Sequence, residues 1–423
     1  MNNSLTAYKV REQLSKFLGI FSPHFSKPVT GFIGEMLYGL QAFKDVKLSQ
    51  IARGLDEDIA LKETCERLSR NLAKEGLCET MSEAIAREGA KHVRKEAVIA
   101  VDVTDIRKYC AKSMPYLATV RDGSEKELGP GYWACAAVAC ESGGRKMVPL
   151  HLRLWSCEAP GFRSENDEIF EVIETVSRGA GRRGIYAIDR GGDRGDILDF
   201  LAGKGLDYVV RLVGDRNLLW GRRGKEALAE KLASKCKMRY TETLVRETKE
   251  GEKTHHIEYG VMEVKLPWRK DEPLRMVVVK GFGEKPMMLL TTLAPTTSRK
   301  ALEQVVEAYL TRWRVEDAIR FIKQSYRLED IRLLNYTRLR NMMAIVLAAA
   351  YFTSAWLGKS LRREILAGNL VRLSKRLFGV PEFHSYALAD GISTVLRRSG
   401  RWLRKTLPAL ADPAQLLLHF SSA

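Results

Sequence analysis

The chain has 423 residues, of which 45% are hydrophobic and 29% are charged. This composition excludes a disordered, collagen-like or low-complexity protein, and the length predicts more than one domain. Lys and Arg number 69 against 52 Asp and Glu, a formal net charge of +17. Such a surplus predicts a polyanionic partner, either nucleic acid or an anionic membrane surface.

The sequence offers little support for a membrane or a secreted protein. No basic segment followed by an apolar stretch opens the chain, so no secretory signal is predicted. The longest apolar run, Met342 to Leu357, is shorter than the roughly 20 residues that a membrane span needs, and is predicted to be a buried helix. The 7 cysteines include no CxxC pair, which disfavours a disulfide framework or a zinc ribbon and favours a reducing cytosol.

The predicted elements change in type along the chain. Residues 1–93 are predicted to be helical, and strands are predicted at 97–101, 133–139 and 147–154, the last two joined by a Gly143-Gly144 turn. A helix at 164–177, a strand at 184–189, a helix at 193–202 and a strand at 208–213 follow. The order predicts a mixed α/β sheet with helices.

The second half of the chain is predicted in three parts. Residues 215–290 alternate in hydropathy and indicate a β-rich insertion. A long helix is then predicted from about Ser298 to Tyr326, with Thr297 or Ser298 as its cap. The remainder is predicted to be helical and basic.

Three carboxylates are notable for their positions. Asp102 follows the apolar run 97–101, whose lack of alternation indicates burial on both faces; a carboxylate there needs compensation, which a divalent cation supplies best. Asp189 ends another apolar strand before the glycine turn at 191–192, and strand ends of this kind collect ligands in α/β sheets. Glu316 lies inside the long predicted helix.

Polar residues form a stripe along that predicted helix. At about 100° per residue, five side chains fall within an arc of roughly 80°. They are Tyr309, Arg312, Glu316, Arg320 and Lys323. The other positions, among them Leu310, Trp313 and Phe321, are apolar and predicted to be largely buried. An acid flanked by cations and a phenol suits a metal ligand beside phosphate-binding groups.

Each acid also has an ordinary structural interpretation. Arg312, Glu316 and Arg320 at four-residue spacing are typical of an exposed salt-bridge ladder. Asp189 could simply cap the helix after the glycine turn, and Asp105 could take the place of Asp102 if its strand runs longer. The combination of two strand-end acids and one helical acid on a basic chain favours a functional site, and carboxylate ligands suit Mg²⁺ or Mn²⁺.

These residues resemble a known family. Tyr309-x2-Arg312-x3-Glu316-x6-Lys323 matches the Y-R-E-K signature of a large group of bacterial insertion-sequence DDE transposases, and Asp102 and Asp189 resemble that group's first and second catalytic aspartates. The resemblance covers residues 90–335, including the β-rich insertion between the second aspartate and the glutamate.

The resemblance implies an RNase H-like catalytic core and a definite chemistry. Asp102, Asp189 and Glu316 would hold two Mg²⁺ ions, or Mn²⁺ as a substitute. One ion would activate water or a DNA 3′-hydroxyl, and the other would stabilise the leaving oxygen of an in-line phosphoryl displacement. Tyr309, Arg312 and Lys323 would contact phosphates near the cleaved end. Cutting would pass through a DNA hairpin before the freed end joins a target.

Weaker assignments complete the expected site. Arg320, on the same stripe, and Arg190, Arg211 and Arg216, near the ends of the predicted strands, are candidate DNA-phosphate contacts, although surface salt bridges are equally expected. Related enzymes hold a flipped base with an aromatic side chain of the β insertion. Trp268 and Trp220 are the candidates here, although an ordinary core position is favoured for each.

The resemblance also implies a division of labour along the chain. Residues 1–93 would bind the terminal inverted repeats; 94–214 and 291–335 would form the catalytic core; 215–290 would be the insertion; and 336–423 would serve dimerisation or DNA contact. The expected partner is double-stranded DNA, bridged by a homodimer, in the bacterial cytoplasm at the nucleoid. Two other functions remain open: a silent, transposase-derived DNA-binding protein and a metal-dependent DNA nuclease. The presence of all three acids argues against the first, and the full signature argues against the second.

Overall fold

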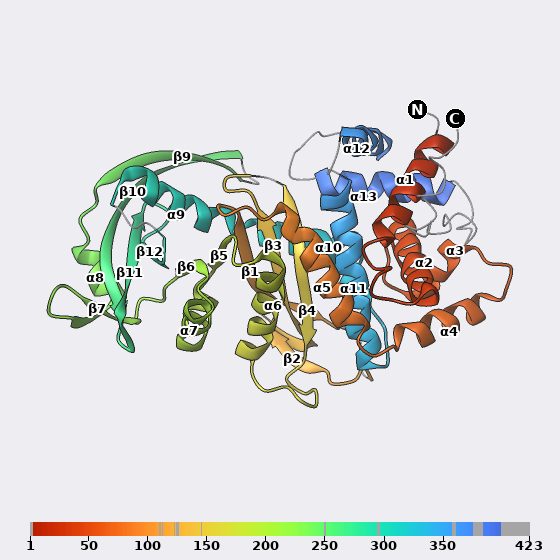
Figure 1. Ribbon diagram of the computed structural model, residues 1–423, viewed down its shortest axis with the longest axis horizontal. Helices are drawn as coiled ribbons and strands as arrows, with labels where there is room; N and C mark the ends of the chain where they lie inside the picture. The colour runs from red at the N-terminus through yellow and green to blue at the C-terminus, as the bar shows by residue number, and fades with distance from the viewer. Residues whose placement is uncertain are drawn as a thin grey trace, which may run out of the picture.

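The N-terminal part of the chain is helical. The structure, a computed structural model, describes residues 3–109, 111, 113–121, 123, 127–144, 146–248, 251–293, 297–357, 361–374 and 384–398. The first helices are α1 (Asn3–Leu18), α2 (Lys27–Phe43), α3 (Leu48–Leu55), α4 (Leu61–Leu72) and α5 (Leu77–Gly89), followed by the short 3₁₀ helix η1 (Ala90–His92). They lie at one end of the molecule, beside the C-terminal helices (Figure 1).

The central sheet has the expected mixed α/β architecture. Its strands are β1 (Val98–Arg107), β3 (Leu128–Cys140), β4 (Met147–Trp155), β5 (Ile185–Ile188) and β6 (Asp207–Arg211). They are ordered β4-β3-β1-β5-β6; β3 is antiparallel to both β1 and β4, whereas β1, β5 and β6 are parallel. This is an RNase H-like sheet, as the family resemblance implies.

Two features of these strands differ from the sequence prediction. The edge strand β2 (Ala118–Arg121), which pairs with β3, was not predicted, and β1 extends six residues beyond the predicted end at Val101. The parallel pairing of β1 with β5 does stop at Val101, but the antiparallel pairing with β3 continues to Arg107. The apolar run therefore marks the stretch of β1 that has neighbours on both sides, and not the whole strand.

Helices cover both faces of the sheet. On one face lie α6 (Glu165–Ala180), capped by the Ser164 hydroxyl, which accepts from Asp167 N at 3.1 Å, and α7 (Gly195–Gly203), which follows the 3₁₀ helix η2 (Arg190–Gly192). On the other lie α9 (Arg299–Thr311) and α10 (Arg314–Ser325). Ser298 is the cap of α9, with its hydroxyl 3.4 Å from Ala301 N.

The long helix predicted from Ser298 to Tyr326 is wrong in one respect, because it breaks at Arg312 and Trp313. Around the break the backbone amides bond to carbonyls three residues back, as in Val315 N to Arg312 O at 2.9 Å and Glu316 N to Trp313 O at 3.1 Å. Three-residue bonding tightens the turn and shifts the angular phase of everything that follows. Residues before and after the break therefore do not share one straight stripe.

The β-rich insertion extends the same sheet. It contains β7 (Asn217–Trp220), β8 (Lys225–Leu228), α8 (Ala229–Lys235), β9 (Tyr240–Thr248), β10 (Gly251–Leu266), β11 (Arg269–Lys280) and β12 (Met287–Thr291). Strand β12 pairs with β6 and so joins the insertion to the core. In the described part of the chain the result is one 12-stranded sheet, with the insertion at the end of the molecule away from the N-terminal helices (Figure 1).

The C-terminal part is also helical and includes a buried helix where one was predicted. The elements are the 3₁₀ helix η3 (Leu328–Asp330), α11 (Tyr336–Tyr351), the π-helix η4 (Phe352–Trp356), α12 (Leu361–Leu373) and α13 (His384–Arg398). From Met342 to Phe352 every residue of α11 and the start of η4 is buried. No helix in the described ranges is long and apolar enough to cross a membrane. Much of the basic C-terminal region, residues 358–360, 375–383 and 399–423, lies outside the described residues.

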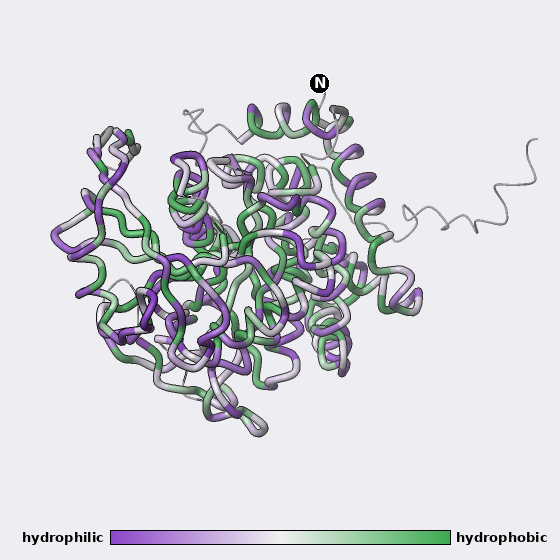
Figure 2. The backbone as a smooth tube through the Cα atoms, turned by 60° about the vertical axis from the view of Figure 1, so that its left-hand side comes forward, coloured by the Kyte–Doolittle hydropathy of each residue, from purple (hydrophilic) through white to green (hydrophobic). Residues whose placement is uncertain are grey.

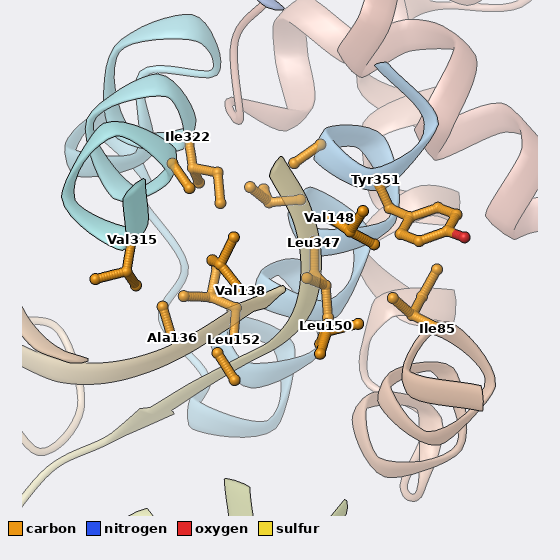
Figure 3. Close-up of a cluster of buried hydrophobic side chains, with 14 of the residues drawn as sticks. Ile85, Ala136, Val138, Val148, Leu150, Leu152, Val315, Ile322, Leu347 and Tyr351 are labelled. Atoms are coloured by element: carbon orange, nitrogen blue, oxygen red, sulfur yellow. The ribbon is translucent and has the colours of Figure 1, made fainter. Parts of the chain in front are cut away.

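The hydrophobic core fixes α10 against the sheet. Figure 3 shows Val315 and Ile322 of α10 on one side of the β3–β4 hairpin, facing Ala136 and Val138, while Leu347 of α11 lies on the other side. Hydrophobic segments gather in the middle of the molecule (Figure 2). Because Val315 and Ile322 are 0% and 2% exposed, the helix that carries Glu316 cannot slide along the sheet without losing this burial.

Candidate active site

The sheet register places Asp102 and Asp189 side by side. Val101 of β1 pairs in parallel with Ile188 of β5, so the next residue of each strand is an aspartate at the same edge of the sheet. Residues in register on parallel strands point to the same face. The two carboxylates therefore extend together from the carboxyl ends of the paired segments, where ligand sites of α/β sheets form.

Helix α10 brings Glu316 to the same place. Its neighbour Val315 packs in the same buried cluster as Ala136, which is the β3 partner of Asp102 (Figure 3). Arg312 lies between the two acids: its Nη1 is 3.6 Å from Asp102 Oδ2 and its Nη2 is 3.0 Å from Glu316 Oε1. The guanidinium is almost fully enclosed, because Arg312 is only 5% exposed.

The proximity of the acids affects the protonation of Asp102. Burial raises the pKa of the Asp102 carboxyl to about 7, the charge of Arg312 opposes this rise, and the charges of Asp189 and Glu316 add to it. Like charges raise the pKa of an acid only when they are near enough to repel its ionised form. All three predicted acids thus act on one site.

Asp105 has different partners. It is 7% exposed, and its Oδ1 lies 3.6 Å from Nζ of Lys323. Lys323 is also 3.3 Å from Glu329. Strand β1 does run past Asp105, as the alternative assignment required, but the described charges that act on Asp102 are those of Arg312, Asp189 and Glu316.

The structure separates Tyr309 from the other residues of the predicted stripe. Tyr309 is 1% exposed, packs in the cluster under α9, and has the Arg312 guanidinium 5.7 Å from its ring centre. Arg320 is exposed and pairs with Asp317 at 3.5 Å, not with Glu316. The salt-bridge ladder is therefore present only in its first step, from Arg312 to Glu316.

Arginines near the strand ends differ in their surroundings. Arg211 follows Val210, which pairs with Ile188, so the side chains of Asp189 and Arg211 are neighbours in the row across β1, β5 and β6. Arg190 is exposed beside Asp189. Arg216 is engaged structurally, since its Nε bonds to Asp193 Oδ1 at 2.7 Å. Asp189 also has a capping role, because its Oδ1 accepts from Gly191 N at 2.8 Å in the short helix η2.

The prediction that Trp268 occupies an ordinary core position is wrong. Its side chain is 44% exposed, its Nε1 donates to Asp199 Oδ1 at 2.8 Å, and Arg216 lies 5.6 Å from its ring. Trp220 is half-buried, with Lys235 5.3 Å from its ring. Trp313, predicted to be buried, is 49% exposed because the helix breaks beside it. Trp313 is therefore an exposed aromatic side chain next to the acids, and helical periodicity in the sequence could not identify it.

The acids suit a divalent cation by their chemistry. Hard carboxylate oxygens are the ligands that Mg²⁺ and Mn²⁺ prefer. Among the described residues, however, no group of three Asp, Glu, His or Cys side chains is arranged so that it could already hold a metal ion. At this site Arg312 supplies the positive charge instead. Asp102, Asp189 and Glu316 therefore match a divalent cation in residue type, while Arg312 pairs with two of them.

Comparison with known proteins gives the family. A family described as "Transposase DDE domain" matches residues 94–352, which is more than half of the chain and includes all three acids. No curated protein is significantly similar in sequence. Among solved structures, a piggyBac transposase in a synaptic complex with hairpin DNA matches with 10% identity and a TM-score of 0.42, over 96% of this chain and 84% of that one. On the strength of the domain match, the chain belongs to the DDE transposase family.

Proposed function

We propose that this protein is the transposase of a bacterial insertion sequence, which binds the element's terminal inverted repeats and cuts and joins DNA at Asp102, Asp189 and Glu316. The observation that supports this best is the register of β1 and β5, which sets two aspartates side by side, with Glu316 joined to them through Arg312. Members of the family generally use divalent metal ions; we propose Mg²⁺, with Mn²⁺ as a substitute and two ions in each site.

Each residue has a distinct part in this proposal. Asp102, Asp189 and Glu316 would hold the metal, which would supply an activated oxygen nucleophile and stabilise the leaving oxygen. Arg312 would turn its guanidinium from the acids to a DNA phosphate, for which its fork of donors is suited. Arg211 and Arg190 contact phosphates beside Asp189, and Lys323 and Arg320 contact them along α10. Buried Tyr309 acts through its contact with Arg312.

The rest of the chain positions the DNA. We propose that residues 1–93 read the terminal repeat, that residues 336–423 serve dimerisation and DNA contact, and that two protomers bridge two ends in the bacterial cytoplasm at the nucleoid. Residues 94–214 and 291–335 form the catalytic unit and 215–290 the insertion. The pathway is cut-and-paste, with a nicked 3′-hydroxyl attacking the opposite strand to form a hairpin. Trp268, exposed in the insertion, is the preferred aromatic for a flipped base, and Trp220 is the second choice.

A cleavage assay tests this function. Purified protein is incubated with a labelled duplex that carries the element's own end, with Mg²⁺, with Mn²⁺ or with EDTA, and the products are separated on a denaturing gel. We expect a metal-dependent nick that matures into a hairpin, and no cutting by Glu316→Gln. Asp317→Asn is the matched control, because the neighbouring acid pairs with Arg314 and Arg320 and not with Arg312.

Other outcomes distinguish the alternative functions. A duplex that is bound but left uncut by the parent protein would identify a silent DNA-binding protein. Cutting without a hairpin or a joined product would identify a nuclease, or a transposase that follows another pathway. Cutting that survives in Glu316→Gln would remove this glutamate from the catalytic set.

A further inference from the structure

Basic side chains gather at the edge of the sheet opposite the catalytic acids. They come from residues 91–96, which contain three Lys/Arg and one Glu, and from residues 178–183, which contain three Arg and no acid. Each segment leads directly into a strand, the first into β1 and the second into β5. We call this surface the basic edge, and its exposed members are Lys91, Arg94, Lys95, Arg178, Arg182 and Arg183.

The two segments of the basic edge are in contact. Arg183 Nη1 donates to Val93 O at 2.8 Å, and its Nη2 donates to Ala90 O at 3.3 Å. The ends of α5 and α6 also approach closely, because a Cβ atom on Gly179 would lie 3.1 Å from Ala86 O. The basic side chains of both segments therefore belong to one surface, whose shape is held by backbone contacts.

Most of this positive charge is not neutralised by acids. Lys91 forms an ion pair with Glu88, and Arg178 lies 3.4 Å from Glu83. Arg183 donates to carbonyl groups, which leave its charge in place. Within the described ranges, no carboxylate lies at ion-pair distance from the other three members, which are Arg94, Lys95 and Arg182. The surface is thus free to bind an anion.

The backbone at Arg182 adds a second observation. Its φ is 64°, directly after Gly181 at 60°, so an arginine adopts the left-handed conformation that favours glycine. This conformation is unfavourable for a residue with a Cβ atom, and such residues cluster at functional sites. The side chain of Arg182 is therefore placed at a conformational cost, at a position where it forms no ion pair with a described residue.

The composition of the surface favours nucleic acid over a membrane. Basic surfaces that bind membranes also carry apolar side chains, which enter the lipid interface. Among the described residues, none of the large exposed apolar side chains lies in residues 83–97 or 174–205, which form and surround the basic edge. Unpaired cations without apolar neighbours suit a phosphate backbone, which is bound without regard to sequence.

The strands separate this surface from the acids. Asp102 lies five residues beyond Ala97, which at about 3.3 Å per residue places them roughly 17 Å apart. Asp189 lies equally far beyond Gly184, because β1 and β5 are parallel and in register. The basic edge and the catalytic acids therefore lie at opposite ends of the same two paired strands.

From these observations we propose that the basic edge binds the backbone of a second DNA duplex, separate from the duplex that reacts at the acids. Binding is electrostatic and independent of sequence, with Arg94, Lys95 and Arg182 as the main phosphate contacts. The choice of DNA as the polyanion rests on the proposed function, while the surface itself is defined by its unpaired cations.

A capture experiment tests this proposal. The protein is saturated with a biotinylated duplex that carries the element's end, immobilised in EDTA, and offered a labelled mixed-sequence duplex across a series of KCl concentrations. The triple variant Arg94→Gln/Lys95→Gln/Arg182→Gln should capture the second duplex at least about tenfold more weakly. Its plot of log K against log [KCl] should be less steep by about 2–3, at about 0.9 for each lost phosphate contact. Its affinity for the end duplex should stay within about twofold of the parent.

Two control variants separate charge at this surface from other effects. Arg94→Lys/Lys95→Arg/Arg182→Lys keeps the charges and should capture the second duplex like the parent. Lys231→Gln/Lys270→Gln/Lys285→Gln removes the same net charge from exposed lysines of the insertion and should also behave like the parent. A loss in the first control equal to that of the Gln variant would show that these residues serve the fold. An equal loss in the second would assign the effect to net charge, and either result would overturn the proposal.

The remaining outcomes distinguish this surface from the proposed function. If vesicles of phosphatidylcholine and phosphatidylserine retain the parent but not the Gln variant, while both capture DNA equally, the surface binds membranes and the DNA assignment is wrong. If the parent cuts the end duplex in Mg²⁺ but captures no second duplex, the basic edge fails and the transposase function stands. If it captures the second duplex through the basic edge but cuts no DNA, the surface stands and the transposase function fails.

Discussion

The guanidinium of Arg312 reaches the Glu316 carboxylate four residues further along the chain, with Nη2 3.0 Å from Oε1, and its other terminal nitrogen is 3.6 Å from Asp102. One buried cation thus binds two of the three acids that would hold a metal ion. In the proposed site, Arg312 and a metal ion would compete for the same carboxylates, because each would neutralise the same charge.

Arg312→Gln should therefore increase the affinity of the DNA-free protein for Mn²⁺ severalfold, measured by titration calorimetry. It should also lower the metal-free unfolding free energy by about 1–3 kcal/mol, because the acids lose their partner. DNA cutting should fall, since the phosphate contact is lost. Arg320→Gln is the control and should leave Mn²⁺ affinity unchanged. Weaker Mn²⁺ binding by Arg312→Gln would show that the arginine assists the metal.

Asp102 and Asp105 should respond differently to substitution. Asp102→Asn should abolish cutting and leave binding of the DNA end largely intact, because the metal site is local to the reacting phosphate. Asp105→Asn should retain cutting within about tenfold, since Lys323 keeps Glu329 as a partner. Gel-shift and cleavage assays on the same duplex measure both effects. An inactive Asp105→Asn beside an active Asp102→Asn would reverse the assignment.

Trp268→Ala should slow hairpin formation without slowing the first nick. Stacking of a base on an aromatic ring contributes about 1–3 kcal/mol, and in the proposed pathway a flipped base would be needed only for the hairpin. Trp268→Phe should keep most of the activity, although it cannot donate to Asp199. Single-turnover time courses separate the two steps. An equal defect in Trp268→Phe would assign the effect to the lost hydrogen bond and hence to the fold.

Lys108 should give the protein a stability that rises with pH. Its Nζ donates to the carbonyl oxygens of Glu329 and Ile331, both at 2.6 Å, and burial lowers the pKa of this amine to about 7. Between pH 7 and the ordinary lysine pKa of about 10.4, the Lys108 amine carries a proton in the unfolded chain but not in the folded protein. The free energy of unfolding therefore increases with pH across this range. Below pH 7 the destabilisation caused by the buried Lys108 amine is complete.

Urea unfolding at pH 7 and pH 9 measures this effect. The parent midpoint should rise between the two values, and the rise should be smaller in Lys108→Met. Lys204→Met is the control, because this lysine is 42% exposed and pairs with Glu174 at the surface. An identical rise in Lys108→Met and in the parent would mean that Lys108 titrates normally in the folded state.

Patterns with a local physical cause could be predicted from the sequence. The run at 97–101, the short strand before Asp189 and the buried helix from Met342 are apolar because each has neighbours all around it, and all three are observed. Asp102 was identified because a charge at the end of a buried strand is costly without compensation, and Asp189 because ligands collect at strand ends. Strand β2 was not predicted, because a strand of four residues at the edge of a sheet buries too few side chains to give a recognisable hydropathy pattern.

What depends on the phase of a helix or on long-range contacts could not be predicted. The break at Arg312–Trp313 exposes Trp313 and separates Tyr309, at the end of α9, from the stripe that Glu316 and Arg320 share on α10. It follows from packing α9 and α10 separately on one sheet. The predicted stripe assumed a straight helix, and no residue between 298 and 326 is a glycine or proline that would signal a break.

The sequence by itself determined the residue types of the site, their order and the α/β alternation, because each depends on neighbours along the chain. Only the tertiary structure decided that Asp102 and Asp189 share an edge and that Arg312 lies between two acids. These relationships join residues as far apart as 214 positions, counted from 102 to 316. They arise from strand register and core packing, which no local pattern encodes.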